Sequence, residues 1–151
     1  MLDRLLPKFV GGTGCVGLLA IRVAAGSAMV MHGLPKIQNP TGWMKGSDMP
    51  GALQAAAAVA EFGGGVCWVL GALTPIASVL IACTMLTAIF KWHVPNGHPF
   101  VAAPGPTPSP SFELAAVYLS IAVGLLLIGP GLLSVDAIFF RPKRHLDRPG
   151  V

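Results

Sequence analysis

Charged residues are scarce in this chain. They make up 11% of its 151 residues, whereas ordinary soluble domains carry about 25%. Apolar side chains make up 54%, and the mean hydropathy is +0.71. This composition is that of a membrane protein, with enough residues for one domain. No basic patch is interleaved with aromatic residues, which argues against a nucleic-acid partner.

Motifs of the common enzyme classes are missing as well. The sequence contains no phosphate-binding loop, dinucleotide fingerprint, nucleophile elbow or His-Glu-x-x-His motif. Its three cysteines, Cys15, Cys67 and Cys83, lie in apolar stretches without a Cys-x-x-Cys pair, so we interpret them as small buried hydrophobic residues. If the chain takes part in redox chemistry, a lipid-soluble quinone or a partner subunit must carry much of it.

Four apolar stretches are each long enough to cross a membrane as a helix, which takes about 20 residues. We expect these helices at about 11–32, 51–73, 75–92 and 112–130. Gly33 and Pro35 supply a stop signal after the first stretch. The tight, uncharged link between the second and third stretches predicts an antiparallel hairpin.

Two of the remaining segments are predicted to form a loop and a tail. The loop 93–110 contains six prolines, and proline removes backbone donors that a helix needs, so an extended outer loop is expected. Residues 131–151 combine apolar and basic side chains and are interpreted as an interfacial piece with a basic tail. The chain 1–151 is therefore predicted to be a single all-α domain, an integral-membrane four-helix bundle.

Basic residues predict the orientation of this bundle. The side that holds both termini carries Arg4, Lys8, Arg141, Lys143, Arg144 and Arg148. The opposite side carries Lys36, Lys45 and Lys91. The positive-inside rule then places both termini in the cytoplasm and the two longer loops outside. Membrane lipids are the first expected partners, and Trp43 and Trp92 fit an outer aromatic belt.

Two ionisable residues interrupt the apolar stretches, Arg22 in the first and Glu61 in the second. A charge near mid-bilayer costs roughly 2.5–3.5 kcal/mol on insertion scales, so it usually faces a partner or a functional cavity. Counted from the outer helix ends, both lie about 15 Å deep at 1.5 Å per residue. We therefore expect an Arg22–Glu61 ion pair, either a structural clamp or a proton-handling or quinone-binding pair. Gly26, Gly64 and Gly65 would let the neighbouring helices approach closely.

Polar or small residues also follow one face of the other two stretches. The third stretch has Thr84, Thr87 and Lys91, and the fourth has Glu113, Ser120 and Gly124. We expect all of these faces to meet in a polar interior that widens towards the outside. The outer mouth would then gather His32, Lys36, His93, His98 and Glu113.

These residues could also have purely structural roles instead of functional ones. His32 could interact with the last carbonyls of its helix, and His93 and His98 could be solvated loop residues. Their spacing is not a strong zinc pattern, and we assign no metal site. A b-type haem between His32 and His93 is a weaker alternative. Lys36 and Lys91 could simply extend to the membrane interface.

An ordered set of motifs runs along the chain: Arg22, His32-Gly33, Lys36, Gly42-Trp43, Glu61-x-Gly63-Gly64, Gly71-x-Leu73-Thr74-Pro75, His93, Gly97, His98 and Glu113. Together with the four-stretch layout, this set resembles the DoxX family of small four-helix membrane proteins over about residues 15–135. The resemblance implies a bundle in the cytoplasmic membrane with links to redox complexes. Relatives of the family include the DoxD-type subunit of thiosulfate:quinone oxidoreductase.

We therefore expect a membrane subunit of a quinone-linked redox system, with a polar cleft open to the outer side. Glu61 or Glu113 would accept protons, Arg22 would set the charge of Glu61, and His32 would polarise a quinone oxygen or attract anions together with Lys36.

Substrate contacts would come from Lys36, His93, His98 and Trp43, around a quinone headgroup or a small sulfur compound. Quinone is the expected cofactor. Other subunits of a redox complex, or a second copy of this chain, are the expected protein partners. The alternative is a non-catalytic accessory subunit that docks on a larger membrane complex, in which the ion pair is structural.

Overall fold

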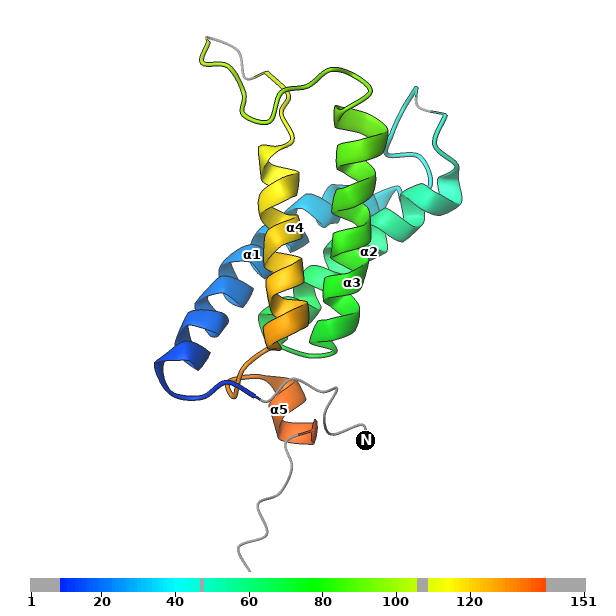
Figure 1. Ribbon diagram of the computed structural model, residues 1–151. Coiled ribbons are helices and arrows are strands. Elements are labelled where there is room, and N and C mark those ends of the chain that lie inside the picture. Colours follow the sequence, from blue (N-terminus) through cyan, green and yellow to red (C-terminus); the bar gives the residue numbers. More distant parts are fainter. Residues whose placement is uncertain (1–8, 47, 106–108, 141–151) are drawn as a thin grey trace, which may run out of the picture.

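The computed structural model describes residues 9–46, 48–105 and 109–140. Every regular element in this part of the chain is helical (Figure 1), which confirms the all-α prediction. In chain order the elements are α1 (Gly12–Gln38), α2 (Gly51–Leu70), α3 (Thr74–Thr87), the π-helical turn η2 (Ala88–His93), α4 (Glu113–Ile128) and α5 (Val135–Phe140).

Within the described part of the chain, three helical segments are long and apolar enough to cross a membrane: Gly12–Gln38, Gly51–Leu70 and Thr74–His93. Helix α4 is also apolar but has 16 residues, about 24 Å at 1.5 Å per residue. Large apolar side chains are exposed along these helices, among them Ile21, Val59, Val79, Val117 and Leu127. These side chains contact membrane lipids. A helix can lie in lipid because its backbone N–H and C=O groups are hydrogen-bonded within the helix. These are the helices of a multi-pass membrane protein.

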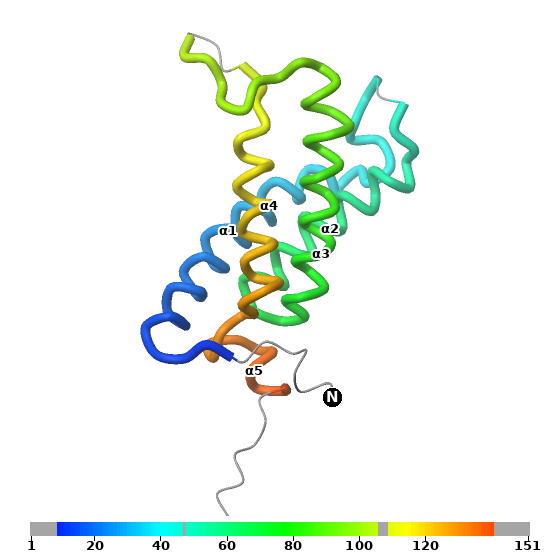
Figure 2. Tube along the Cα trace, viewed as in Figure 1, coloured from blue at the N-terminus to red at the C-terminus, as the bar shows by residue number. Residues whose placement is uncertain are grey.

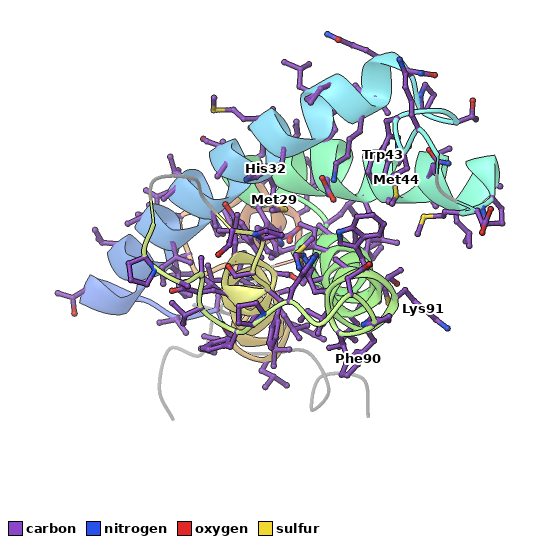
Figure 3. The ribbon with its side chains drawn as sticks, turned by 90° about the horizontal axis from the view of Figure 1, so that it is seen from above. Met29, His32, Trp43, Met44, Phe90 and Lys91 are labelled. Atoms are coloured by element: carbon purple, nitrogen blue, oxygen red, sulfur yellow. The ribbon has the colours of Figure 1, made fainter. Side chains whose placement is uncertain are left out.

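The four longer helices form two antiparallel hairpins that cross each other (Figure 1). Helices α1 and α2 run as one inclined pair, and α3 and α4 stand upright as the other. Seen from above, α3 and α4 are viewed nearly end-on, whereas α1 and α2 run across the view (Figure 3). The crossing means that α2 and α3 are close near their connecting turn and separate away from it.

Glycines allow α1 and α2 to pack closely. A Cβ added at Gly26 would lie 2.8 Å from the Gly65 carbonyl oxygen, and one added at Gly65 would lie 2.8 Å from the Gly26 oxygen. A Cβ at Gly33 would lie 2.7 Å from Phe62 Cα. Real Cβ atoms essentially never come so close, so only glycine permits this approach. The expected small-residue contact at Gly26 and Gly65 is confirmed.

The turn between α2 and α3 is tight, as predicted, but the two helices cross (Figure 3), so the expectation of an antiparallel hairpin between them is wrong. Gly71 ends α2 in the left-handed region at φ 65°, which glycine adopts without strain. Its N–H donates to Trp68 O at 3.1 Å, and the Ala72 N–H donates to Cys67 O at 2.9 Å. These bonds satisfy carbonyls at the helix end. Pro75 then begins α3, where a missing backbone donor costs little.

The predicted helix ends shift, most of all in the first helix. Helix α1 does not end near His32 but continues through Pro35 to Gln38. Pro35 removes one backbone donor, but it is exposed, and membrane helices tolerate proline where neighbouring groups compensate. The close contact of Gly33 with Phe62 holds α1 against α2 just before the proline. Elsewhere, α2 ends at Leu70 rather than at residue 73, and the third span ends in η2.

The core is apolar and lies where the two hairpins meet. Trp68 and Ile81 are fully buried, and the Trp68 Nε1–H donates to Ser78 Oγ at 3.0 Å. The expectation that every helix turns a polar stripe to the centre is wrong. Ser120 and Glu113 on α4 are exposed, and the Ser120 hydroxyl bonds to carbonyls of its own helix.

Two ends of the bundle can be distinguished. The start of α1, the α2–α3 turn and α5 lie at one end (Figure 2), where the Leu132 N–H donates to Val10 O at 2.9 Å. We call this the tail end. The α1–α2 connection and the segment after η2 lie at the other, the loop end. The terminal basic residues lie outside the described residues, so the cytoplasmic placement of the termini stays a prediction.

Candidate functional site

Arg22 and Glu61 do not form the expected ion pair. The guanidinium of Arg22 donates from Nη1 to Pro130 O at 2.6 Å and from Nη2 to Leu133 O at 2.7 Å. The prediction was wrong because it measured depth from a helix end near His32, whereas α1 reaches Gln38. Arg22 therefore lies level with the α2–α3 turn, and a Cβ at Gly71 would collide with its guanidinium.

Around Arg22 the chain forms a buried polar cluster at the tail end. The carboxylate of Asp136 accepts from Leu73 N at 2.7 Å and from Thr74 N at 2.9 Å, which caps the first turn of α3. The Asp136 N–H donates to Gly71 O at 2.8 Å. We call Arg22, Gly71 and Asp136 the tail clamp. Sequence reasoning missed Asp136 because it assigned residues 131–151 to an interfacial tail.

Glu61 pairs with Lys36 instead. The Lys36 Nζ lies 2.6 Å from both Oε1 and Oε2 of Glu61. The Glu61 side chain is 5% exposed and that of Lys36 is 24% exposed. Lys36 Nζ also lies 4.5 Å from the ring centroid of Trp43, within range of a cation–π interaction. The ammonium group is thus held between a carboxylate and an indole ring.

Gln54 holds Trp43 in this position. Its backbone oxygen accepts from Trp43 Nε1 at 3.0 Å, and its side-chain oxygen accepts from Met44 N at 3.0 Å. The Gln54 Nε2 donates to Met49 O at 2.9 Å. Sequence reasoning missed this buried residue, although a single glutamine at the start of an alanine-rich helix is a signal that could have indicated it.

A cavity of about 820 Å³ lies beside the ion pair. Lys36, Trp43 and Glu61 form one part of its wall, and most of the remaining wall is apolar. Helix α2 contributes Ala56, Ala57 and Ala60, and α3 with η2 contributes Leu80, Thr84 and Trp92. Figure 3 shows Trp43 and Met44 from the α1–α2 loop beside α2, while Lys91 projects from the far side of α3.

The cavity follows from the crossing of the two hairpins. Near the turn, α2 and α3 are in close contact, since a Cβ at Gly64 would lie 3.0 Å from Ile81. Towards the loop end the helices separate, and alanine side chains on α2 are too small to fill the space. The Thr84 and Thr87 hydroxyls donate to Leu80 O and Cys83 O of their own helix. Their hydrogen atoms are therefore not available to a ligand in the cavity.

The other expected site residues lie elsewhere. His32 is exposed, and its ring stands edge-on to that of Tyr118 at 6.2 Å. Glu113 is exposed in the first turn of α4. His93 and His98 lie against each other, with their Nδ1 atoms 3.1 Å apart. The predicted outer mouth is therefore not one cluster: the cavity wall includes Lys36 but none of these four residues.

The three cysteines are free and occupy three different environments. Cys15 is buried, Cys67 is partly buried and Cys83 is exposed. Cys83 also lines the cavity. The interpretation of all three as buried hydrophobic residues therefore holds for Cys15 and is wrong for Cys83, because α3 turns that face towards the space that α2 leaves open.

Comparison with known proteins gives a consistent result. The model of the DoxX family matches residues 17–94, a segment that includes Lys36, Trp43, Glu61 and Trp92. The chain is also 30% identical over 133 residues to a protein of Bacillus subtilis (strain 168) named "Putative oxidoreductase CatD", a match that covers 86% of this chain and 92% of that one. No solved structure matches the chain. On the family match and this relative, the chain belongs to the DoxX family.

Proposed function

We propose that the loop-end cavity binds a quinone and that the chain is the quinone-binding membrane subunit of a redox system. The observation that carries this proposal is a hydrogen-bonded ion pair, with its carboxylate buried, in the wall of an otherwise apolar cavity. Membership of the DoxX family and the oxidoreductase name of the Bacillus relative support a redox role.

The size and lining of the cavity suit a ring with two carbonyl oxygens and an apolar tail. Its volume of about 820 Å³ falls within the range of roughly 300–1,000 Å³ common for small-molecule sites. The alanine wall of α2 would contact the tail. Trp43 and Trp92 offer aromatic faces for the ring.

Lys36 can bind a quinone oxygen without leaving Glu61. An ammonium group has three N–H donors, and two of them are directed to the Glu61 oxygens. The third can donate to a carbonyl oxygen in the cavity. A positive charge at that point stabilises the negative charge that develops on the oxygen during reduction.

Glu61 is the group in the wall that can exchange protons. Reduction of a quinone to a quinol takes up two electrons and two protons. In the proposal a partner redox subunit delivers the two electrons, and Glu61 takes up the two protons one after the other from water and passes each to a reduced quinone oxygen. The direct contact with Lys36 offsets part of the cost of placing a carboxylate in the wall of an apolar cavity.

The proposed arrangement in the membrane has four spans, with α4 as the shortest. The tail end would face the cytoplasm, and the loop end with the cavity would face the outside of the inner membrane. The common position of α5 and the start of α1 supports an even number of crossings.

Quinone binding can be measured on protein purified in mild detergent from native membranes. Retained quinone is identified by mass spectrometry, and a short-chain quinone is then titrated while tryptophan fluorescence is followed. The charge-neutral double variant Lys36→Gln/Glu61→Gln removes both charges without leaving one buried and unpaired. We expect it to lose retained quinone and to bind at least about tenfold more weakly, equivalent to about 1.4 kcal/mol.

Matched controls are available at the same end of the bundle. Lys91→Gln and Asp48→Asn each remove one charge from an exposed side chain that does not line the cavity. Both should bind quinone as the wild type does. Wild-type protein that neither retains nor binds a quinone, or equal binding in the wild type and the double variant, would contradict the proposal.

An accessory role is the second candidate. Helix α5 exposes Ile138, Phe139 and Phe140, at 78%, 76% and 62%, and such an apolar surface suits the lipid boundary or a partner subunit. Stable co-purification with a redox complex that stays fully active in the Lys36→Gln/Glu61→Gln background would favour this role over quinone binding.

A further inference from the structure

We propose that His93 and His98 form a separate site that binds a divalent ion of a late first-row transition metal, with Cu²⁺ bound most tightly. The two imidazoles would bind the ion through their Nδ1 atoms. This inference does not depend on quinone binding, because neither histidine lines the cavity.

The distance between the two nitrogens fits two ligands of one ion. The Nδ1 atoms lie 3.1 Å apart. With metal–nitrogen bonds of about 2.0–2.1 Å, two ligands at a right angle are about 2.9 Å apart, and at a tetrahedral angle about 3.3 Å apart. The ring planes are inclined by 67°, so the two rings are not stacked on each other.

The chain between the histidines is a hydrogen-bonded turn that fixes this geometry. The His98 N–H donates back to His93 O at 3.0 Å, and the Gly97 N–H donates to Val94 O at 3.0 Å. The Asn96 Nδ2 donates to Trp92 O at 2.6 Å. Gly97 has φ +67°, a value that favours glycine and that returns the chain towards His93. A site arranged before the ligand arrives loses less free energy on binding.

The π-helical turn before the site contributes to the placement of His93. In η2 the wider turn shifts each following residue around the helix axis, and the Val94 N–H donates to Ile89 O at 2.9 Å. Single π-turns inside helices occur frequently at functional sites. On one side, the ring centroids of Phe112 and His93 lie 6.5 Å apart, and Phe100 packs on Phe112 at 5.3 Å, which places an apolar cluster beside the His93 imidazole.

Without a metal the same distance accommodates a hydrogen bond, in which one imidazole N–H donates to the other nitrogen. For both Nδ1 atoms to bind the ion, the ring that holds its proton on Nδ1 must carry it on Nε2 instead. Among the described residues no group of three or more His, Cys, Asp and Glu side chains could hold an ion, so water or another exogenous ligand would complete the coordination. Two imidazoles favour Cu²⁺ over its neighbours in the Irving–Williams order.

The test uses full-length protein in detergent without a histidine tag, titrated with Cu²⁺ alone. His145 lies outside the described residues and is changed to Gln throughout, which leaves His32, His93 and His98. We expect one equivalent of Cu²⁺ to bind, with an electron paramagnetic resonance spectrum that shows two coupled nitrogens. His93→Gln or His98→Gln should weaken binding at least tenfold, whereas His32→Gln should not change it.

A second measurement avoids variants that fail to fold. Diethylpyrocarbonate modifies accessible imidazoles, and mass spectrometry locates the products in protein of otherwise native sequence. Cu²⁺ should protect His93 and His98 and leave the modification of His32 unchanged. Equal modification of His93 and His98 with and without Cu²⁺, or copper affinity that survives both single substitutions, would overturn the proposal.

Discussion

Helix α1 carries two cationic side chains that are held in opposite ways. Arg22 at the tail end is 1% exposed and binds two backbone carbonyls with its planar fork. Lys36 at the loop end is 24% exposed and binds one carboxylate beside a cavity. A guanidinium matches fixed oxygens in a rigid geometry, whereas an ammonium on a flexible stem can move between partners.

We infer from this difference that the tail clamp serves the stability of the fold and that the loop end serves ligand binding. At the tail clamp, the polar groups of Arg22 and Asp136 bind the backbone of segments that are distant in sequence. Both side chains are buried. At the loop end, alanine walls leave space next to a charged pair. We therefore expect substitutions in the tail clamp to change the free energy of unfolding, and substitutions at the loop end to change ligand binding.

The largest effect is expected from Arg22→Ala. It removes two charge-assisted hydrogen bonds, leaves the carbonyls of Pro130 and Leu133 unpaired and opens a hole, which together should cost about 3 kcal/mol or more. The loss is measured as a lower midpoint of thermal unfolding in detergent. Lys91→Ala is the control, since that side chain is exposed. An unchanged midpoint for Arg22→Ala would refute the role of the clamp.

The second-largest loss of stability is expected from Gly65→Ala. The added Cβ would meet Val30 N at 2.7 Å and Gly26 O at 2.8 Å, so α1 and α2 must separate at a cost of about 1–3 kcal/mol. Gly63→Ala is a matched control two residues away, because a Cβ there meets nothing within 4 Å. Equal unfolding midpoints for the two variants would show that the close helix contact is not needed.

Asp136→Asn is expected to have a moderate effect. The amide keeps the shape of the side chain but accepts the Leu73 and Thr74 N–H bonds with one oxygen instead of two, and it lacks the negative charge at the start of α3. A lost cap of this kind costs about 1 kcal/mol. Chemical unfolding would measure it beside Asp48→Asn, whose exposed carboxylate should be dispensable. Equal losses in the two variants would rule out the cap.

Glu61→Gln should change stability least, by less than about 1 kcal/mol, since Lys36 is partly exposed and can turn to solvent. Its effect should appear in quinone binding instead, measured by fluorescence titration. Arg22→Lys, which keeps the charge at the tail clamp, should bind quinone like the wild type. A Glu61→Gln variant that binds quinone normally but unfolds easily would reverse the assignment of the two regions.

Several features were readable from the sequence. The all-α class, the tight turn at Gly71 and the close packing at Gly26 and Gly65 follow from hydropathy, from turn-forming residues and from small residues at helical spacing. The partners of Arg22 were not readable, because Pro130 lies 108 residues away in a segment that folds back after α4. The Lys36–Glu61 pair was missed for one reason: Pro35 was interpreted as the end of a helix that continues past it.

A photoreactive quinone would test the central claim most directly. The purified protein is labelled with an azido-quinone, with and without an excess of unlabelled quinone, and the labelled peptides are identified by mass spectrometry. We expect competed labelling in the cavity walls, at Lys36 or residues 43–46 of the α1–α2 loop, at residues 53–61 of α2 or at residues 80–92 of α3 and η2, and its loss in Lys36→Gln/Glu61→Gln. Labelling confined to other segments, or labelling that unlabelled quinone does not reduce, would contradict it.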